Sequence, residues 1–234
     1  MDEAFAGKQA AALRAVEEVQ SGMVVGLGTG STAEIFVEAL GQRVKRERLR
    51  ITGVPTSERT RLLATSLGIP LSLPGQVPRT DVAIDGADQV ERGSLALIKG
   101  MGGALLREKI VASAARRMVV IVDRAKLVDR LGARTALPVE VVAFGSQAVA
   151  ERLAARGWNP TLRMVGGRPF QTDGGNHIVD CAIADIPDAA QLEKDLLKVE
   201  GVIDTGLFLG LAETVLVGGV SGVEILKRPI PPQS

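Results

Sequence analysis

Two aspartates, one on each side of a Gly-Ala pair, follow one of the apolar segments of this sequence. Asp85 and Asp88 enclose Gly86 and Ala87 directly after the apolar run at 82–84. An isolated Asp in such a place is most often a turn or helix-capping residue. Two carboxylates at the end of a buried strand can instead accept hydrogen bonds from sugar hydroxyls or act as acid and base. They could also ligate a metal, but no His or Cys cluster accompanies them, and we expect no metal.

Lys99 and Glu108 stand on either side of a second glycine-rich stretch. Gly100, Gly102 and Gly103 allow close approach of the backbone, and their amides can stabilise an oxyanion. Glu108 falls on the helix expected after this turn, and its apolar neighbours indicate that the helix is largely buried. Burial raises the pKa of a carboxyl, which a general base near neutral pH requires. From spacing alone, a general base and an ordinary surface glutamate are equally supported.

A third segment, at 26–32, has the sequence Gly-Leu-Gly-Thr-Gly-Ser-Thr and joins an expected strand to an expected helix. It is not a dinucleotide-binding fingerprint, because Ser31 stands where the third glycine would lie, and no Gly-Lys-Ser/Thr follows for a Walker loop. Its amides and hydroxyls at a helix N-terminus suit an anion such as phosphate. The alternative is a tight turn that lets strand and helix pack. We also expect Ser31 or Thr32 to cap the helix, with Glu34 completing a capping box.

Short apolar runs alternate with helical segments through the first half of the chain. Strands are predicted at 23–25, 51–54, 82–84, 95–98 and 118–122, and helices at 2–20, 58–67, 104–115 and from Ser31 onward. This alternation is typical of an α/β protein with a Rossmann-like open parallel sheet and helices on both faces. Ligands of such sheets bind at the carboxyl ends of the strands. Strand ends are followed by the two aspartates, by both glycine-rich segments and by Lys126, so we expect these groups to meet at one edge of the sheet. The alternative for Lys126 is an ordinary exposed lysine.

The order of elements changes after residue 130. We predict strands at 139–144, 161–165, 177–183 and 202–209, with helices at 146–156 and 189–199. This βαββαβ order is the ferredoxin-like arrangement. It predicts a small α+β domain at 131–208, inserted into a catalytic domain at 1–130 and 209–234. We expect residues 214–217 to return as a strand to the sheet of the catalytic domain. His177 and Cys181 are interpreted as ordinary strand residues of the small domain.

The composition excludes several classes of protein. Lys and Arg total 28 and Asp and Glu total 27, so the formal net charge is +1, and only 3% of the residues are aromatic. Balanced charge and few stacking side chains argue against a nucleic-acid partner. One Cys excludes an internal disulfide framework, and the N-terminus resembles no targeting signal. With no stretch suited to a membrane, we expect a cytoplasmic protein.

The ordered set of motifs between Met23 and about Gly210 resembles the A-type ribose-5-phosphate isomerase family. The motifs are Gly28-Thr29-Gly30-Ser31-Thr32, Asp85-Gly86-Ala87-Asp88, Lys99-Gly100-Met101-Gly102-Gly103, Arg107-Glu108-Lys109, Lys126, Leu137-Pro138-Val139-Glu140-Val141, Asp173-Gly174-Gly175-Asn176 and Gly206-Leu207-Phe208. One such motif would be a weak signal, but the ordered set is specific. Two positions depart from the family pattern: Gln89 stands where many members have Glu, and Met101 where Gly is common.

The resemblance implies an aldose–ketose isomerase that interconverts D-ribose 5-phosphate and D-ribulose 5-phosphate without metal or cofactor. Glu108 would carry a proton between C2 and C1 through a cis-enediolate, and Lys99 with the turn amides would stabilise the negative oxygen. Asp85 and Asp88 would hold sugar hydroxyls and assist ring opening. The implied substrate-binding set is Thr29, Gly30, Ser31, Thr32, Asp85, Gly86, Ala87, Asp88, Lys99, Gly100, Met101, Gly102 and Lys126. A homodimer or homotetramer is expected, and the loop that holds the phosphate stays open.

Two other functions compete with this one. The first is a non-catalytic sugar-phosphate sensor, which would need a DNA-binding helix-turn-helix or a partner interface; the sequence shows no basic recognition helix. The second is a related isomerase or deaminase that acts on amino-sugar phosphates. The presence of both Glu108 and Lys99 favours an enzyme over a sensor.

Overall fold

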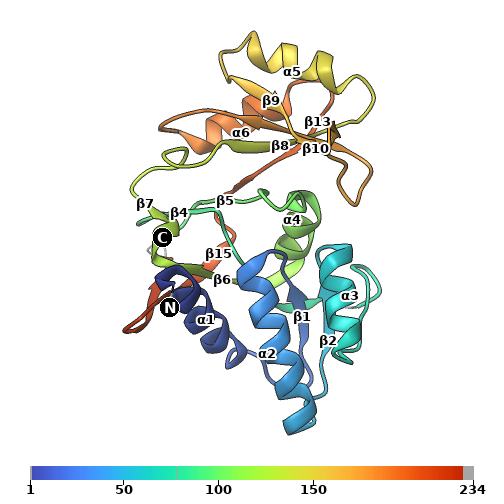
Figure 1. The fold of residues 1–234 in the computed structure, drawn as a ribbon, viewed down its shortest axis with the longest axis vertical. Coiled ribbons are helices and arrows are strands. Elements are labelled where there is room, and N and C mark those ends of the chain that lie inside the picture. Colours follow the sequence, from blue (N-terminus) through green and yellow to red (C-terminus); the bar gives the residue numbers. More distant parts are fainter. Residues whose placement is uncertain (1, 78, 229–234) are drawn as a thin grey trace, which may run out of the picture.

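A six-stranded sheet forms the centre of the larger part of the molecule in the computed structural model, which describes residues 2–77 and 79–228 (Figure 1). Its strands are, in spatial order, β16 (Gly222–Lys227), β15 (Ala212–Gly219), β6 (Ala115–Asp123), β3 (Thr80–Asp85), β1 (Val24–Leu27) and β2 (Thr52–Pro55). Neighbours pair in parallel, which confirms the predicted open sheet, except that β16 is antiparallel to β15. The edge strand β16 was not predicted, because none of its residues is fully buried and its apolar pattern is correspondingly weak.

Helices cover both faces of this sheet, as predicted. The helices are α1 (Glu3–Val16), α2 (Ser31–Glu47), α3 (Glu58–Ser66) and α4 (Leu105–Ala114). Side chains of a strand point alternately to its two faces. In β6, Val119 and Ile121 share a core with α1, α2 and α3, whereas Val120 and Val122 share the other core with α4. Because only α4 of these four lies on the second face, it is the helix that meets the remainder of the chain (Figure 1).

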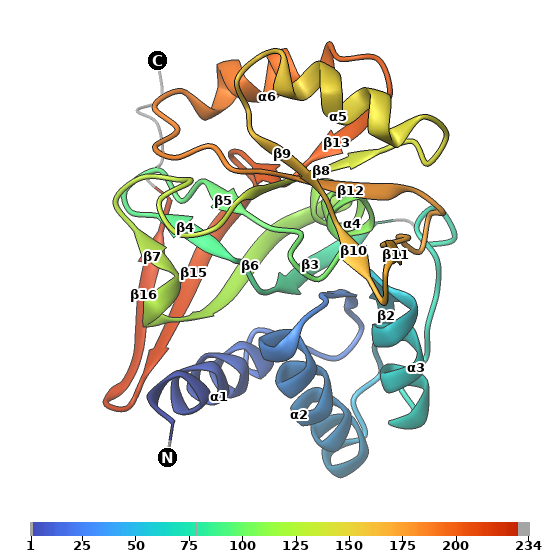
Figure 2. The same ribbon diagram turned by 45° about the horizontal axis from the view of Figure 1, so that its top comes forward.

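A second, four-stranded sheet lies beyond α4 and is antiparallel throughout (Figure 2). Its order is β13 (Val202–Thr205), β8 (Leu137–Val141), β12 (His177–Cys181) and β9 (Pro160–Leu162), and α5 (Ser146–Ala154) and α6 (Ala189–Leu197) cover its outer face. The predicted βαββαβ order is therefore present. The strand predicted at 161–165 is divided at Arg163 into β9 and β10 (Met164–Val165), which pairs with β11 (Arg168–Pro169) in a hairpin.

The domain limits that we predict, 1–130 with 209–234 and 131–208, stay predictions. Residues 229–234, at the end of the first of these domains, lie outside the described residues.

A small third sheet, which the sequence did not predict, connects the two larger ones. It contains β14 (Leu207–Phe208), β5 (Leu97–Ile98), β4 (Gln89–Glu91) and β7 (Leu127–Val128), and the 3-10 turn η1 (Arg124–Lys126) precedes β7. The strands predicted at 95–98 and 202–209 both contribute to it, the latter being interrupted at Gly206. Gly206 is required there, since a Cβ atom would lie 2.3 Å from the carbonyl oxygen of Lys99. This close approach lets Gly206 accept a hydrogen bond from the Lys99 amide at 2.9 Å, which fixes the start of the second glycine-rich stretch.

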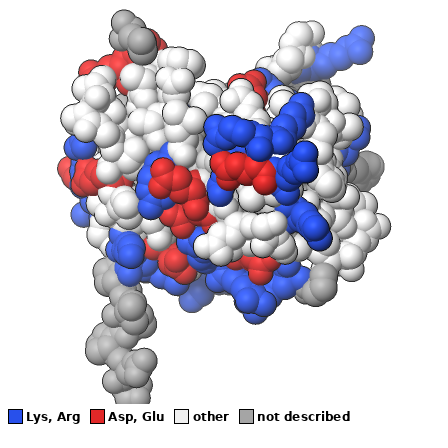
Figure 3. All heavy atoms as spheres, turned by 90° about the horizontal axis from the view of Figure 1, so that it is seen from below, with Lys and Arg blue, Asp and Glu red and all other residues white. Residues whose placement is uncertain are grey.

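Charged side chains of both signs are interspersed on the molecular surface. On the face that Figure 3 shows, acidic and basic groups alternate in small clusters rather than separating into one large patch of either sign. Within the described residues, no helix has both the length and the apolar character to cross a bilayer.

Candidate active site

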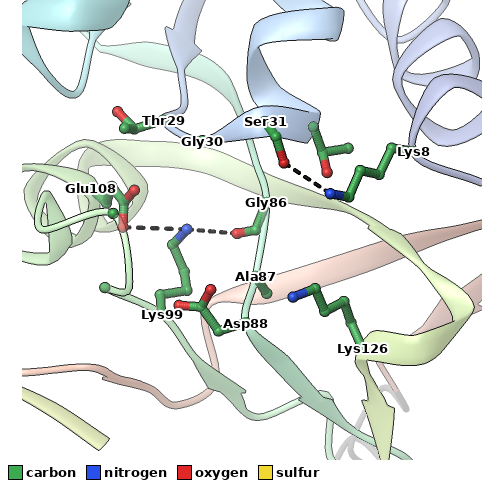
Figure 4. Close-up of a pocket in the computed structure, with 13 residues that line it drawn as sticks. Lys8, Thr29, Gly30, Ser31, Gly86, Ala87, Asp88, Lys99, Glu108 and Lys126 are labelled. Atoms are coloured by element: carbon green, nitrogen blue, oxygen red, sulfur yellow. Dashed lines mark hydrogen bonds and ion pairs between the residues drawn. The ribbon is translucent and has the colours of Figure 1, made fainter. Parts of the chain in front are cut away.

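The carboxyl ends of β1 and β3, the turn after β5 and the 3-10 turn η1 surround a hollow of about 90 Å³ (Figure 4). The hollow is lined by Lys8, Thr29, Gly30, Ser31, Thr32, Gly86, Ala87, Asp88, Lys99, Gly100, Gly102, Glu108 and Lys126. The structure thus brings together segments that are up to about a hundred positions apart, as the convergence of strand ends requires. Of the predicted residues, Asp85 and Met101 do not line the hollow, whereas Lys8 lines it and was not predicted.

Lys99 lies between two buried carboxylates at the base of this hollow. Its Nζ is 3.1 Å from Asp85 Oδ2. The same atom is 3.3 Å from Glu108 Oε2 and donates a hydrogen bond to the Gly86 carbonyl at 2.6 Å (Figure 4). All three charged side chains are no more than 5% exposed. Burial alone would lower the pKa of Lys99, but the attraction of Asp85 and Glu108 outweighs it and raises that pKa. Lys99 therefore stays positively charged at neutral pH.

Both carboxyls of the cluster have a raised pKa. Burial and the nearby charge of Asp85 raise the pKa of Glu108 to about 8, although Lys99 opposes the shift. Burial likewise raises the pKa of Asp85, again against the attraction of Lys99. Glu108 Oε2 is within ion-pair distance of Lys99, yet it accepts no hydrogen bond from any group in the part of the chain that the structure describes. A buried carboxyl group whose oxygen accepts no hydrogen bond, on a residue that lines a hollow, can accept and release a proton near neutral pH.

The glycines of the first glycine-rich segment have a packing role. A Cβ atom on Gly28 would lie 2.2 Å from Asp85 Oδ1, and one on Gly26 would lie 2.7 Å from the Val111 side chain. With glycine at these positions, the backbone passes close enough for the amide of Thr29 to donate to Asp85 Oδ1 at 3.1 Å. The tight-turn alternative is therefore correct for Gly26 and Gly28, and this packing fixes Asp85 beneath Lys99.

The predicted capping box at the start of α2 is wrong. The helix begins at Ser31 with Gly30 as its N-cap residue, and no side chain makes a capping hydrogen bond. Glu34 instead pairs with Arg59 at 2.6 Å. The Ser31 hydroxyl accepts a hydrogen bond from Lys8 Nζ at 3.0 Å on the rim of the hollow (Figure 4). The Thr29 hydroxyl is directed away, toward a group of hydroxyls on the neighbouring loop formed by Thr56, Ser57 and Thr60.

Lys8 and Lys126 reach the hollow from two different elements, α1 and η1 (Figure 4). Together with the N-terminus of α2 they surround one end of the hollow with positive charge, which suits an anion. Lys8 gave no signal in the sequence, because a lysine on an amphipathic helix is usually solvated. Its neighbour Gly7 allows α1 to approach β15: a Cβ atom there would lie 2.7 Å from the Gly218 carbonyl oxygen.

Asp88 and the two residues that depart from the family pattern complete the surroundings. Asp88 Oδ2 accepts a hydrogen bond from the Met101 amide at 3.0 Å, while the Met101 side chain is 49% exposed outside the hollow. Gln89 is fully buried and faces away, where it accepts from the Gly132 amide and donates to the Thr135 hydroxyl. Gln89 does not line the hollow, and its amide anchors the 132–135 loop.

A buried proton-transfer cluster next to a cationic pocket, at the carboxyl edge of an α/β sheet, defines an enzyme that acts by acid–base chemistry on a small anionic molecule. The family model for ribose 5-phosphate isomerase A (phosphoriboisomerase A) matches residues 52–222. The chain belongs to this family.

Individual relatives agree with the family model. Ribose-5-phosphate isomerase A of Gloeobacter violaceus is 52% identical over 219 residues, covering 94% of this chain and 95% of its own. The solved structure of ribose 5-phosphate isomerase A from Methanocaldococcus jannaschii superposes with a TM-score of 0.90 at 41% identity, covering 94% of this chain and 98% of the other. A D-ribose-5-phosphate isomerase in complex with phospho-erythronic acid superposes at 0.91, also with 41% identity, covering 94% and 97%.

Proposed function

We propose that this chain is a ribose-5-phosphate isomerase, an enzyme that interconverts D-ribose 5-phosphate and D-ribulose 5-phosphate. Family membership supports the reaction, and one observation of the structure carries the mechanism. Glu108 presents a buried carboxyl oxygen without a hydrogen-bond donor to the hollow, with the cationic Lys99 at 3.3 Å. An aldose–ketose isomerisation needs one base that removes a proton from carbon and one positive group that stabilises the oxygen anion thus formed.

In the proposed reaction, Glu108 removes the proton from C2 of the open-chain aldose. The electron pair of that bond forms the C1–C2 double bond of a cis-enediolate, while the carbonyl electrons move to O1. Protonation of C1 by Glu108 and transfer of the O2 proton to O1 then give the ketose, so no electrons leave the substrate. Lys99, with its raised pKa, stabilises the enediolate oxygen without giving up its own proton.

The two aspartates have different proposed roles. Asp88 lines the hollow and is held by the Met101 amide, so it can accept hydrogen bonds from sugar hydroxyls and assist ring opening. Asp85 does not line the hollow; its carboxylate accepts from the amides of Gly86 and Thr29 and pairs with Lys99. We therefore assign Asp85 as a positioning residue that orients Lys99, rather than as a group that contacts the substrate.

The phosphate group belongs, in this proposal, at the cationic end of the hollow. Lys8 and Lys126 provide the charge, Ser31 and Thr32 provide hydroxyls, and the first amides of α2 point toward the anion. The remaining predicted binding residues, which include Gly30, Gly86, Ala87, Gly100 and Gly102, contribute backbone to the walls. Met101 is assigned a backbone role only, since its side chain lies outside.

A direct assay tests the proposed function. The purified chain should convert ribose 5-phosphate to ribulose 5-phosphate at the same rate with and without EDTA, because no step is assigned to a metal. Binding of ribose 5-phosphate without turnover would instead support a sensor. Faster conversion of an amino-sugar phosphate would support the related isomerase or deaminase. Loss of activity in EDTA that only added metal restores would contradict the metal-free mechanism.

Phospho-erythronic acid, the ligand of one related enzyme, should inhibit this chain as well. Its carboxylate is planar and anionic, as the enediolate is, so it should occupy the space between Glu108 and Lys99. Cytoplasmic location and a homodimeric or homotetrameric state remain predictions; light scattering of the purified chain measures the latter.

A further inference from the structure

We infer that Arg163, which lies in the smaller part of the molecule, is a positioning residue for the reaction. It orients two peptide groups, the one between Gly100 and Met101 and the one between Met101 and Gly102. The inference rests on the proposed function. Arg163 lies in the interruption between β9 and β10, and its side chain is 13% exposed. It reaches across to the first domain, where its Nη1 donates to the carbonyl oxygens of Gly100 and Met101 at 2.9 and 3.0 Å.

The other nitrogens of the Arg163 guanidinium are occupied within the second domain. Nε donates to Asp180 Oδ2 at 2.8 Å and Nη2 to Asp180 Oδ1 at 2.5 Å, a bidentate pair across strands β9 and β12. The guanidinium also lies 5.8 Å from the ring centre of Phe170. A planar guanidinium that makes two hydrogen bonds to one carboxylate and lies over an aromatic ring has little rotational freedom. Its Nη1 is therefore a fixed donor.

Fixing a carbonyl oxygen also fixes the amide on the other side of the same peptide. Peptide groups are planar, and this structure contains no cis peptide bond among the described residues, so each C=O and the N–H that follows it point in opposite directions. The Gly100 carbonyl faces Arg163, and accordingly the Met101 N–H faces Asp88, to which it donates at 3.0 Å. The Met101 carbonyl also faces Arg163, so the Gly102 N–H is directed to the opposite side, where Gly102 lines the hollow.

Arg163 therefore orients two backbone donors, the amides of Met101 and Gly102. One amide holds the carboxylate of Asp88, and the other faces the space in which an oxygen anion develops. A charge-assisted hydrogen bond to a carbonyl also polarises its peptide, which strengthens the N–H as a donor. The turn is closed by a hydrogen bond from the Gly103 amide to the Gly100 carbonyl at 3.0 Å, and Phe170 packs directly against Gly103. Gly100 and Gly103 adopt φ values of +110° and +78°, which favour glycine.

The experiment compares Arg163→Met with Arg168→Met, a control on the exposed strand β11 of the same hairpin. Arg163→Met should lower kcat roughly 10- to 100-fold and leave KM within about threefold, because the misdirected amides matter most when charge develops on the substrate. Arg163→Lys should recover part of the loss, since it restores a cation but not the bidentate anchor. Arg168→Met should match wild type.

Binding measurements separate positioning from a general structural role. In Arg163→Met, the affinity for phospho-erythronic acid should fall by a factor similar to the fall in kcat, whereas the affinity for inorganic phosphate should stay as in wild type. A kcat within twofold of wild type, or an equal loss of affinity for both ligands, would overturn the inference. An inactive wild-type chain would overturn the proposed function instead, and the two binding measurements would still test Arg163.

Removal of Arg163 leaves Asp180 without its partner, which could prevent folding. The double variant Arg163→Met/Asp180→Asn avoids an unpaired carboxylate and should show the same fall in kcat. If this variant also fails to fold, the contact is structural and the inference is wrong.

Discussion

Lys99 and Lys109 are ten positions apart and at first sight equivalent. Each has its Nζ over the ring of Phe208, at 5.5 and 5.2 Å from the centre, and each pairs with two carboxylates. Lys99 lies at the carboxyl edge of the large sheet, and Lys109 lies where α4 meets β13 of the second sheet. The comparison between these two lysines shows what distinguishes a reactive charge cluster from a structural one.

The cluster around Lys109 is saturated. Its Nζ donates to Asp204 at 2.5 Å, to Glu193 at 3.3 Å and to the Thr205 carbonyl at 2.9 Å, and its side chain is 16% exposed. Asp204 also accepts from the Thr205 amide. Both carboxylates and the Thr205 carbonyl accept from Lys109, so this cluster joins α4 to β13 and α6.

The cluster around Lys99 is drier and incomplete. Its carboxylates are almost wholly buried, and Glu108 Oε2 lacks a donor among the described residues. Glu108 and Lys109 are consecutive on α4, and consecutive helical residues point about 100° apart. One helix thus directs a carboxyl into the hollow and a cation into the domain junction. An incomplete set of hydrogen bonds in a buried cluster, rather than the presence of charge, marks the site.

The largest expected effect comes from Glu108→Gln. The amide keeps the shape of the side chain but cannot accept the C2 proton, so kcat should fall roughly 10²- to 10⁴-fold. Inorganic phosphate should bind as in wild type, because Glu108 lies away from the cationic end. Steady-state kinetics and calorimetry measure the two quantities. Near-normal turnover in this variant would remove Glu108 from the mechanism.

Lys99→Met tests the cation of the same cluster. Loss of the positive charge beside the enediolate should lower kcat roughly 10²- to 10³-fold. The pKa of Glu108 should also rise further, because the attraction that opposes its shift is gone. In a pH profile of kcat/KM, the rise with increasing pH should move to higher pH than in wild type. An unchanged profile and rate would show that Lys99 does not act on the reacting oxygen.

These two residues illustrate how much of the site the sequence could predict. The approximate places of Asp85, Asp88, Lys99 and Glu108 followed from strand ends and glycine-rich turns, because parallel strands bring their carboxyl ends together. What sequence spacing left undecided was whether Glu108 is buried. That depends on how α4 packs against β3 and β6 and on Asp85 and Lys99 next to Glu108, which sequence spacing does not show.

Other features had no local signal at all. The small third sheet depends on strands of two or three residues, too short for an apolar pattern to predict. Lys8 and Arg163 act at the site from elements that looked ordinary: one on an amphipathic helix, the other within a predicted strand. Their roles arise from close packing at Gly7 and from the interruption of β9 and β10, which only the folded arrangement reveals.

The raised pKa of Glu108 also predicts how activity and stability change with pH. As a base, Glu108 must be deprotonated, so kcat/KM should rise with pH and level off above about 8. For stability, the folded chain keeps a proton between pH 4.5 and about 8 that the unfolded chain has released. The free energy of unfolding should therefore decrease as pH rises through this window, by at most about 1.4 kcal/mol per pH unit from this group.

Glu108→Gln provides the control for that prediction, because Gln does not titrate. Urea unfolding of both proteins between pH 5 and 8, within that window, should show a shallower decrease for the variant. Equal slopes would mean that Glu108 has an ordinary pKa in the folded chain, and the contrast with the Lys109 cluster would lose its electrostatic basis.

Of the variants in the two lysine clusters, the smallest effect on activity is expected for Lys109→Met, whose cluster joins α4 to β13 and α6. The free energy of unfolding should fall by about 1–3 kcal/mol, because Asp204 and Glu193 lose their shared partner while half-shielded from water. Lys198→Met, at an exposed pair with Asp195, should cost less than about 1 kcal/mol. At a temperature where both variants are folded, kcat of Lys109→Met should stay within about threefold of wild type. A loss comparable to that of Lys99→Met would show that the domain junction itself sets the geometry of Glu108, and that the two lysines belong to one functional unit.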